Sequence, residues 1–473
     1  MNPPTAPWVR PGDAGYEDAR RRLSVSAVVP PDRPAAVVRP RDTEGVVAAV
    51  HAARAHDLPL TVRSGGHGTA FTALRSGALA LDLSGLDHVR VDPAAGTADV
   101  GPGATSLAVA EALAGTGWSF PVGHKGDVAL GGFLLAGGNG WNQGDWGSAC
   151  ESVLSAEVVL ADGSVTRIDA ASGDAFAALR GAGPAFPAVV TGYRLRLHRE
   201  PVLRARTVGF RADTSPALAE VGAWLDALAA RVRPEVELTV VLGTGASGTE
   251  AVVRATAFGR DAAHADDLLA TLDDDVPERA TTYVRTTTTI PALLRGDTAP
   301  PGLATVAQQA WTRAGYADVL PLLAGPMASA PSSRSTVLVS SASYRRSAPP
   351  ATEPLHRPLG TLTVAAYAVW EAGDGDGSAA AWPTATTEAL AGLVTGHYVG
   401  EADLRRTPGR LVRCWAPGGL ARLAAVRSRL DPEGRFLPPP GDLLPSAATR
   451  FRPPAAHPVG AAAPGPVPEE LTA

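Results

Sequence analysis

The chain contains 473 residues, 45% of them hydrophobic, and carries a formal net charge of -5 at pH 7. This length predicts two domains, each large enough to bury its own core. The balance of 42 basic and 47 acidic residues argues against a general nucleic-acid-binding protein, because such proteins present a basic surface. With only two cysteines, Cys150 and Cys414, the sequence predicts neither a disulfide framework nor a cysteine-based metal site.

The N-terminal segment predicts neither an export signal nor a membrane anchor. Residues 1–22 lack the apolar core of a signal peptide, and the arginines at 20–22 are followed by too short an apolar stretch for a twin-arginine signal. No apolar run reaches the roughly 18 residues that a membrane-spanning helix needs. We therefore expect a cytoplasmic protein with no membrane partner.

Strands and short helices alternate along the first 200 residues. The pattern predicts a strand over 35–40, a helix capped by Thr43 and running to residue 56, strands over 58–64, 77–84 and 88–103, and a helix over 106–117. Further on it predicts a hairpin over 155–169 around an Asp-Gly turn, a short helix over 174–183 and a long strand over 186–201.

Two glycine-rich segments interrupt this alternation, at 63–68 ("RSGGHG") and at 120–147. We expect the second to contain no regular element, because glycine weakens helices and strands. Backbone N–H groups in such loops can hold a phosphate-bearing cofactor, and the lone His67 would lie beside it. No metalloprotease, serine-hydrolase or P-loop motif occurs, so the sequence predicts no metal site.

Residues 201–395 differ in character. Strand patterns over 237–259 and 361–373 and a helical pattern over 215–232 predict an antiparallel sheet with helices on one face. The "GTGASG" at 243–248 precedes a strand rather than a helix, which favours a hairpin turn over a dinucleotide-binding loop. A helix is expected over 419–430, followed by a Pro- and Ala-rich, disordered tail over 441–473.

Several stretches in a fixed order resemble the berberine bridge enzyme-like (BBE-like) branch of the vanillyl-alcohol-oxidase-type, or PCMH-type, FAD oxidases. They are "RPRDTEGVVAAVHAARAHDLPLTVRSGGHG", "VGHKGDVALGGFLLAGGNG", "EVVLADGSV" and "ALRGAGPAFPAVVT". The resemblance is dense over 35–200 and returns near 396–403 and 429–436. It implies an α+β protein with a PCMH-type FAD-binding domain of two α/β subdomains over 1–200, completed by 396–440, and a substrate domain over 201–395.

The resemblance also implies how FAD is held. The histidine of this loop is bonded to the 8α carbon of FAD in the family, which assigns that role to His67. Many members add a second bond from a cysteine where this chain has Lys125, so we expect a single covalent link and none from Cys150 or Cys414. The residues assigned to FAD binding are Arg63, Ser64, Gly65, Gly66, His67, Gly68, Gly123, His124, Gly126, Asp127, Leu130, Gly131, Gly132, Gly137, Gly138, Asn139, Gly140 and Val189.

The catalytic base is less well defined by the resemblance. Where the family often has Tyr-x-Asn-Tyr or Tyr-x-Asn-Phe, this chain has Tyr398, Gly400 and then Glu401. In an extended segment the two side chains would point to opposite faces, so one of them reaches the cavity, and the family position favours Tyr398. Lys125 either faces the flavin edge, where it would stabilise negative charge, or is solvated at a loop tip. Tyr283, Tyr367 and Trp370 can line the substrate pocket or pack in the core.

Together these features predict an FAD-linked oxidase that transfers a hydride from a C–H bond of a small secondary-metabolite or sugar-like substrate to flavin N5, with O2 as acceptor, in a monomer or homodimer. One alternative keeps FAD as the scaffold of a non-redox cyclase or eliminase, which would consume no O2. Another is a binding protein without cofactor, which would be colourless. The sequence leaves the substrate open.

Overall fold

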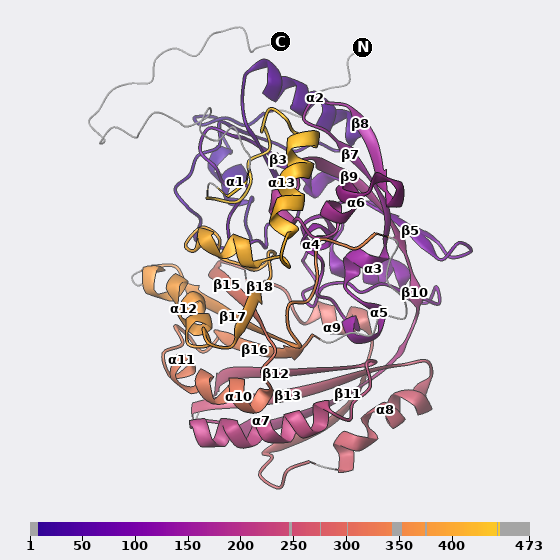
Figure 1. The fold of residues 1–473 in the computed structure, drawn as a ribbon, viewed down its shortest axis with the longest axis vertical. Helices are drawn as coiled ribbons and strands as arrows, with labels where there is room; N and C mark the ends of the chain where they lie inside the picture. The colour runs from indigo at the N-terminus through magenta and orange to yellow at the C-terminus, as the bar shows by residue number, and fades with distance from the viewer. Residues whose placement is uncertain are drawn as a thin grey trace.

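The structure is a computed structural model that describes residues 8–245, 248–274, 276–299, 301–342, 352–373, 376–441 and 443–444. Two small sheets and a pair of short strands form one half of the molecule, and one eight-stranded sheet spans the other (Figure 1). The predicted α+β class is confirmed. Residues 445–473 of the predicted disordered tail lie outside the described part. None of the helices described combines the length and apolar composition that a membrane-spanning helix needs.

The N-terminal half contains a parallel and an antiparallel sheet. The parallel sheet has the order β1 (Ala36–Val38), β3 (Leu79–Asp82), β2 (Leu60–Arg63). The antiparallel sheet has the order β4 (Val89–Asp92), β5 (Thr97–Val100), β9 (Val189–Arg196), β7 (Val153–Val159), β8 (Val165–Asp169). The short strands β6 (Trp118–Ser119) and β10 (His198–Arg199) pair with each other. The helices of this half are α1 (Tyr16–Arg21), α2 (Thr43–Ala55), α3 (Ser106–Leu113), α4 (Leu130–Ala136), α5 (Gln143–Trp146) and α6 (Asp174–Leu179).

Two predictions for this half are wrong. The cap of α2 is Asp42 rather than Thr43, because the Asp42 carboxylate accepts a hydrogen bond of 2.7 Å from the Gly45 N–H. The segment 120–147 does contain helices, α4 and α5, despite its glycines. Burial of Leu130 and Leu134 on one face of α4 offsets the low helix propensity of glycine.

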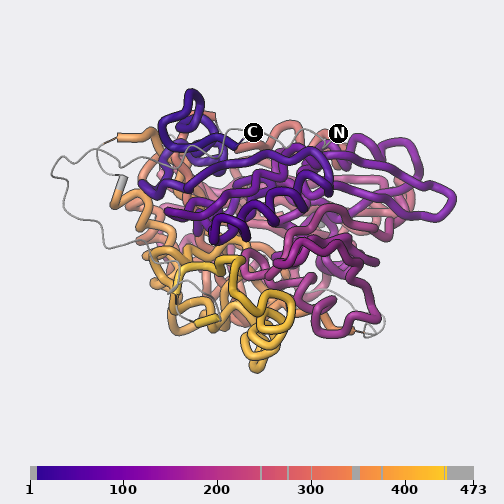
Figure 2. Tube along the Cα trace, turned by 90° about the horizontal axis from the view of Figure 1, so that it is seen from above, coloured from indigo at the N-terminus to yellow at the C-terminus, as the bar shows by residue number. Residues whose placement is uncertain are grey.

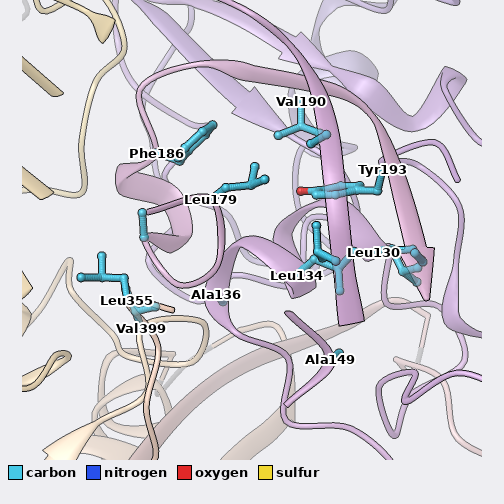
Figure 3. Close-up of a cluster of buried hydrophobic side chains, with 14 of the residues drawn as sticks. Leu130, Leu134, Ala136, Ala149, Leu179, Phe186, Val190, Tyr193, Leu355 and Val399 are labelled. Carbon is cyan, nitrogen blue, oxygen red and sulfur yellow. The ribbon is translucent and has the colours of Figure 1, made fainter. Parts of the chain in front are cut away.

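The packing around α4 explains why residue 131 is a glycine. Leu130 and Leu134 lie beside Tyr193 of β9 (Figure 3), whose hydroxyl donates to the Gly131 carbonyl oxygen at 3.1 Å. A Cβ at Gly131 would come within 2.3 Å of the Ser64 hydroxyl oxygen and 2.8 Å of Pro102. Only glycine lets the helix approach the loop that follows β2.

The second half is built on one antiparallel sheet, as predicted. Its order is β14 (Thr282–Thr288), β11 (Val202–Arg211), β13 (Gly248–Gly259), β12 (Val236–Gly245), β16 (Thr336–Ser341), β17 (Leu362–Glu371), β15 (Leu303–Thr312), β18 (Val394–His397). Helices α7 (Ser215–Ala229), α8 (Ala262–Asp274), α10 (Tyr316–Val319), α11 (Ala324–Ala328) and α12 (Asp376–Glu388) cover its outer face, while α9 (Ile290–Arg295) lies toward the first half (Figure 1). The pairing of β12 with β13 extends to Gly245 and Gly248, so the "GTGASG" segment lies at the end of a hairpin.

The chain then returns to the first half. Helix α13 (Gly419–Leu430) packs against α6, and the yellow C-terminal segment lies along the N-terminal half in both views (Figure 2). The side chain of Arg427 is 1% exposed and donates to the carbonyl oxygens of Ala185 at 2.7 Å and Phe436 at 2.6 Å. Burial lowers the pKa of this guanidinium to about 10. The domain limits at 200 and 395 remain predictions.

Replacement of Arg427 should therefore weaken the packing of the C-terminal segment on the first half of the molecule. Arg427→Ala leaves two buried carbonyl groups without donors, and we expect it to lower the free energy of unfolding by about 3 kcal/mol. Arg429→Ala, an exposed position on the same helix, should stay within about 0.5 kcal/mol of the parent. Urea unfolding curves of the two variants measure this, and equal effects at the two positions would contradict the role given to Arg427.

Candidate active site

A cavity of about 1190 Å³ lies between the glycine-rich loops of the first half and the inner face of the eight-stranded sheet. It exceeds the roughly 300–1,000 Å³ of ordinary small-molecule pockets, so it has room for a large cofactor and a substrate together. Alternate residues of β15, β16 and β17 form its wall on the sheet side, because successive side chains of a strand point to opposite faces. These residues are Thr305, Ala307, Gln309, Thr336, Leu338, Ser340, Thr363, Ala365 and Tyr367.

The first glycine-rich loop leaves β2 and turns along the cavity. Arg63 holds its start, donating to the Asp82 carboxylate at 2.9 Å and to the Gly65 carbonyl oxygen at 3.0 Å. A Cβ at Gly65 would lie 2.9 Å from the Ala129 nitrogen, so the two glycine-rich segments are in close contact there. A Cβ at Gly68, in contrast, would meet nothing within 4 Å. The loop therefore exposes its backbone to the cavity.

The second glycine-rich segment forms the opposite rim. Gly132 faces open space, since an added Cβ would meet no atom within 4 Å. The Asn139 side chain lines the cavity with its amide oxygen and nitrogen buried and without hydrogen-bond partners among the described residues. Unsatisfied buried amide groups are costly, which indicates that a ligand completes them. The exposed loop backbone and the free Asn139 amide fit a long polar cofactor such as FAD.

The structure brings together most of the residues that the sequence assigns to the site. Those that line the cavity are Arg63, Ser64, Gly65, Gly66, His67, Gly68, Gly123, His124, Gly131, Gly132, Asn139 and Gly140, with Lys125, Tyr398 and Glu401. Those that do not line it are Gly126, Asp127, Leu130, Gly137, Gly138 and Val189. Leu130 and Val189 are fully buried in the core, where they support the loops instead. Cys150 and Cys414 are buried away from the cavity.

His67 lies beside a carboxylate. Its Nε2 is 3.4 Å from Asp127 Oδ1, although neither atom completes a hydrogen bond. The Ala299 N–H donates to the other oxygen of Asp127 at 3.1 Å. Burial opposes ionisation of Asp127, but the His67 imidazole and the Ala299 N–H hold the pKa of this carboxyl below its ordinary value. His67 thus faces the cavity next to an ionised partner.

His124 and Lys125 form ion pairs with acidic residues of the second half of the molecule. Lys125 Nζ is 2.6 Å from Asp297 Oδ1, just after α9. His124 Nε2 is 2.6 Å from Glu237 Oε1 on β12, and the His124 ring packs on Trp141 at a centroid distance of 4.3 Å. Lys125 therefore lines the cavity while paired with Asp297, and its place relative to a bound flavin remains a prediction.

Glu401 and Tyr367 form a pair at the sheet side of the cavity. The Tyr367 hydroxyl lies 2.9 Å from each carboxylate oxygen of Glu401, and both residues line the cavity. Burial raises the pKa of Glu401, while the Tyr367 hydroxyl and the charges of Lys125, His124 and His67 lower it; the net effect is a raised pKa. Burial and the neighbouring carboxylate raise the pKa of Tyr367 well above its usual value, so Tyr367 stays a neutral phenol.

The Tyr398 side chain has a different hydrogen-bond partner from the Glu401 side chain. The two residues belong to a turn rather than an extended segment, because the Glu401 N–H donates to the Tyr398 carbonyl oxygen at 3.1 Å. The Tyr398 hydroxyl accepts a hydrogen bond of 3.2 Å from the Gly138 N–H, and the side chain is 6% exposed. Burial first, and then the nearby Glu401, raise the pKa of this phenol. Its placement favours Glu401 as the group that meets a substrate.

Sequence reasoning missed the partners of this site. Of the three aromatic residues proposed as pocket walls, Tyr367 lines the cavity, whereas Tyr283 binds Asp273 and Trp370 packs in the core. Tyr367 and Trp370 lie three residues apart on one strand and so face opposite sides. Glu237 carries a detectable signal, a lone acid on the alternating strand "VELTV". Asp297, in "RGDTAP", carries none.

Comparisons with known proteins agree with this geometry. Residues 34–169 match the family model of an FAD binding domain. The FAD-linked oxidoreductase ptmO of Penicillium ochrochloron is 40% identical over 183 residues, 38% of this chain and 40% of that protein, so the match spans well under two thirds of the relative. The structure of 6-hydroxy-D-nicotine oxidase from Arthrobacter nicotinovorans aligns with a TM-score of 0.79 at 24% identity, covering 92% of this chain and 98% of that one. The BBE-like 1 protein of Physcomitrella patens aligns with a TM-score of 0.80 at 20% identity, covering 92% and 96%.

At these identities the solved structures establish the fold, and the domain match identifies the cofactor class of the glycine-rich half. Fold and domain match agree with the resemblance found in the sequence. The chain therefore contains an FAD binding domain over residues 34–169, and its fold is the one shared by BBE-like proteins and the flavin oxidase with which it aligns.

Proposed function

We propose that this protein is an FAD-dependent oxidase of a small molecule, in which Glu401 accepts the proton that the substrate loses. The observation that carries the proposal is the cavity that joins the glycine-rich loops to the Glu401–Tyr367 pair. The similarity to an FAD-linked oxidoreductase and to an oxidase supports oxidation of a substrate with O2 as acceptor. No observation favours the non-redox cyclase.

The cofactor site would be formed by the two loops. The loop backbone from Gly65 to Gly68 and around Gly132 would contact FAD, and the free amide of Asn139 would hydrogen-bond it. Bound FAD supplies a two-electron acceptor whose N5 takes a hydride. His67, by family resemblance, would hold FAD through a covalent bond to its 8α carbon, and Asp127 would keep the imidazole in place.

Residues on the sheet side of the cavity would carry out the acid–base step. Glu401 is one of the carboxylates that line the cavity, and its raised pKa brings it closer to the pH of the reaction. Tyr367 donates its one hydroxyl proton to this carboxylate and so fixes its orientation. Glu401 would take a proton from a substrate O–H or N–H while the adjacent C–H hydride leaves. The surrounding Thr305, Leu338 and Thr363 provide hydroxyl and apolar contacts suited to an uncharged ring system.

The net reaction is tested by oxygen uptake. When candidate alcohols, amines and sugars include a substrate, the purified protein should consume O2 in air and should bleach its flavin absorbance once oxygen has been removed. Conversion of a substrate without O2 uptake or bleaching would support the non-redox alternative instead. A colourless protein that does not take up FAD would overturn both.

The covalent link is tested with one histidine variant. Acid precipitation of the parent should leave yellow protein whose mass includes one FAD, because the bond to His67 survives unfolding. His67→Ala should release its flavin on acid treatment yet still bind FAD reversibly, since the loop backbone remains. His51→Ala, on the exposed face of α2, is the control and should keep the bound flavin. Retention of flavin by denatured His67→Ala would contradict the assignment.

The base assignment is tested by the rate of flavin reduction under anaerobic conditions. We expect Glu401→Gln to slow reduction by about 10²–10⁴-fold, the usual contribution of a general base. Tyr367→Phe should slow it by about tenfold, the equivalent of one hydrogen bond to a charged group. Tyr398→Phe, whose hydroxyl binds backbone, should change the rate by less than about threefold. A larger effect at Tyr398 than at Glu401 would reverse the assignment.

The same experiment predicts a direction of pH dependence. Glu401 works in its ionised form, so the reduction rate should fall as the pH drops through its pKa. Because burial raises that pKa above its ordinary value, the loss should begin at a higher pH than for an exposed glutamate. Glu401→Gln should remove this acid limb, and an unchanged limb in that variant would point to another base.

A further inference from the structure

The pair formed by His124 and Glu237 has no place in the function proposed so far. His124 belongs to the second glycine-rich segment, whereas Glu237 lies on β12 of the sheet. Val236 and Leu238 are buried against the outer helices, so Glu237 between them faces the cavity. Its carboxylate is held from two sides, by His124 Nε2 at 2.6 Å and by the Asn142 N–H at 3.3 Å. The pair is a fixed feature of the cavity wall.

Charged groups face His124 from each element around it. Glu237 on β12, Asp297 after α9 and Glu401 after β18 are the acidic neighbours, and the ring lies on Trp141. Burial disfavours the charged imidazole, but the charge and hydrogen bond of Glu237 outweigh it, and the pKa of His124 is raised. No hydrogen bond of its Nδ1 is found within the described residues, and the side chain lines the cavity and is 40% exposed. The raised pKa favours the imidazolium form of His124, and its Nε2 lies within hydrogen-bond distance of Glu237.

We propose that Glu237 is a positioning residue of the reaction, which holds His124 as a cation on the cavity wall and through it keeps Glu401 ionised. This inference rests on the proposed function, because it takes Glu401 as the base. Glu237 touches neither Glu401 nor any reacting group in the structure, and it acts through His124.

His124, Lys125 and His67 line the same cavity as Glu401 and lower the pKa of its carboxyl, and His124 is the one whose own charge varies near neutral pH. Tyr367 is a neutral donor, and Lys125 is an ammonium ion paired with Asp297. His67 faces Asp127 within its own half and is the residue assigned to FAD. Only the charge of His124 depends on a carboxylate from the opposite half, and histidine is the side chain that titrates near neutrality. The charge of His124 is thereby tied to a contact between the two halves.

The first test follows the protonation of His124 directly. In protein with isotope-labelled histidine rings, the NMR signal of His124 is identified by its loss in His124→Gln. The parent signal should titrate above the range of an ordinary histidine, and Glu237→Gln should lower its midpoint by about one pH unit or more. Glu235→Gln, the same change two residues earlier and off the cavity, should leave it in place. An ordinary midpoint in the parent, or no shift in Glu237→Gln, would overturn the proposal.

The second test asks whether the effect passes through His124 to Glu401. Glu237→Gln should move the acid limb of flavin reduction up by about one-half to one pH unit, because the cation that favours ionised Glu401 is lost. His124→Gln should cause the same shift, and the double variant should add nothing to it. Additive shifts, or none, would overturn the step to Glu401. If Glu401→Gln itself reduces flavin normally, the base assignment fails, while the NMR titration still decides whether Glu237 controls His124.

Discussion

The site depends on one close approach between the two halves of the molecule. The backbone of residues 123–127 lies against the end of α9, where the Gly126 N–H donates to the Asp297 carbonyl oxygen at 2.7 Å. A Cβ at Gly126 would come within 2.6 Å of the Leu294 carbonyl oxygen, so no other residue fits without a shift of the chain. This contact lets the side chains on either side of Gly126 reach partners beyond their own half.

Each half therefore holds an incomplete site. The first half supplies the glycine-rich loops and the basic side chains of His67, His124 and Lys125, and the second supplies Glu237 and Asp297 as counter-charges for the latter two. The Glu401–Tyr367 pair also combines two parts of the chain. Tyr367 comes from the sheet, and Glu401 comes from the turn that leads back to the first half. The Glu237 carboxylate is mostly buried, which strengthens its interaction with His124, whereas the Lys125–Asp297 pair is partly exposed. The chemistry is thus tied to the packing of the halves.

Much of this could be predicted from the sequence, and the rest could not for physical reasons. The alternation in β12 and β17 predicts an antiparallel sheet, and "RSGGHG" predicts a loop with exposed backbone. Helix α4 escaped prediction because its glycines signal a loop, while the contact with Tyr193 that favours the helix is long-range. The pairing of Tyr367 with Glu401, and of His124 with Glu237, joins residues 34 and 113 positions apart and depends on the three-dimensional register. Local patterns carry no information about such pairs.

The central claim is that cofactor and base meet in one cavity, and an experimental structure of the purified yellow protein tests it most directly. We predict density for the isoalloxazine ring between His67 and the Glu401–Tyr367 pair, continuous with the imidazole of His67, and with a ribityl and phosphate chain along Gly65 to Gly68. A flavin bound elsewhere, or a Glu401 carboxylate turned away from the ring with Tyr367 bonded to another group, would contradict the account.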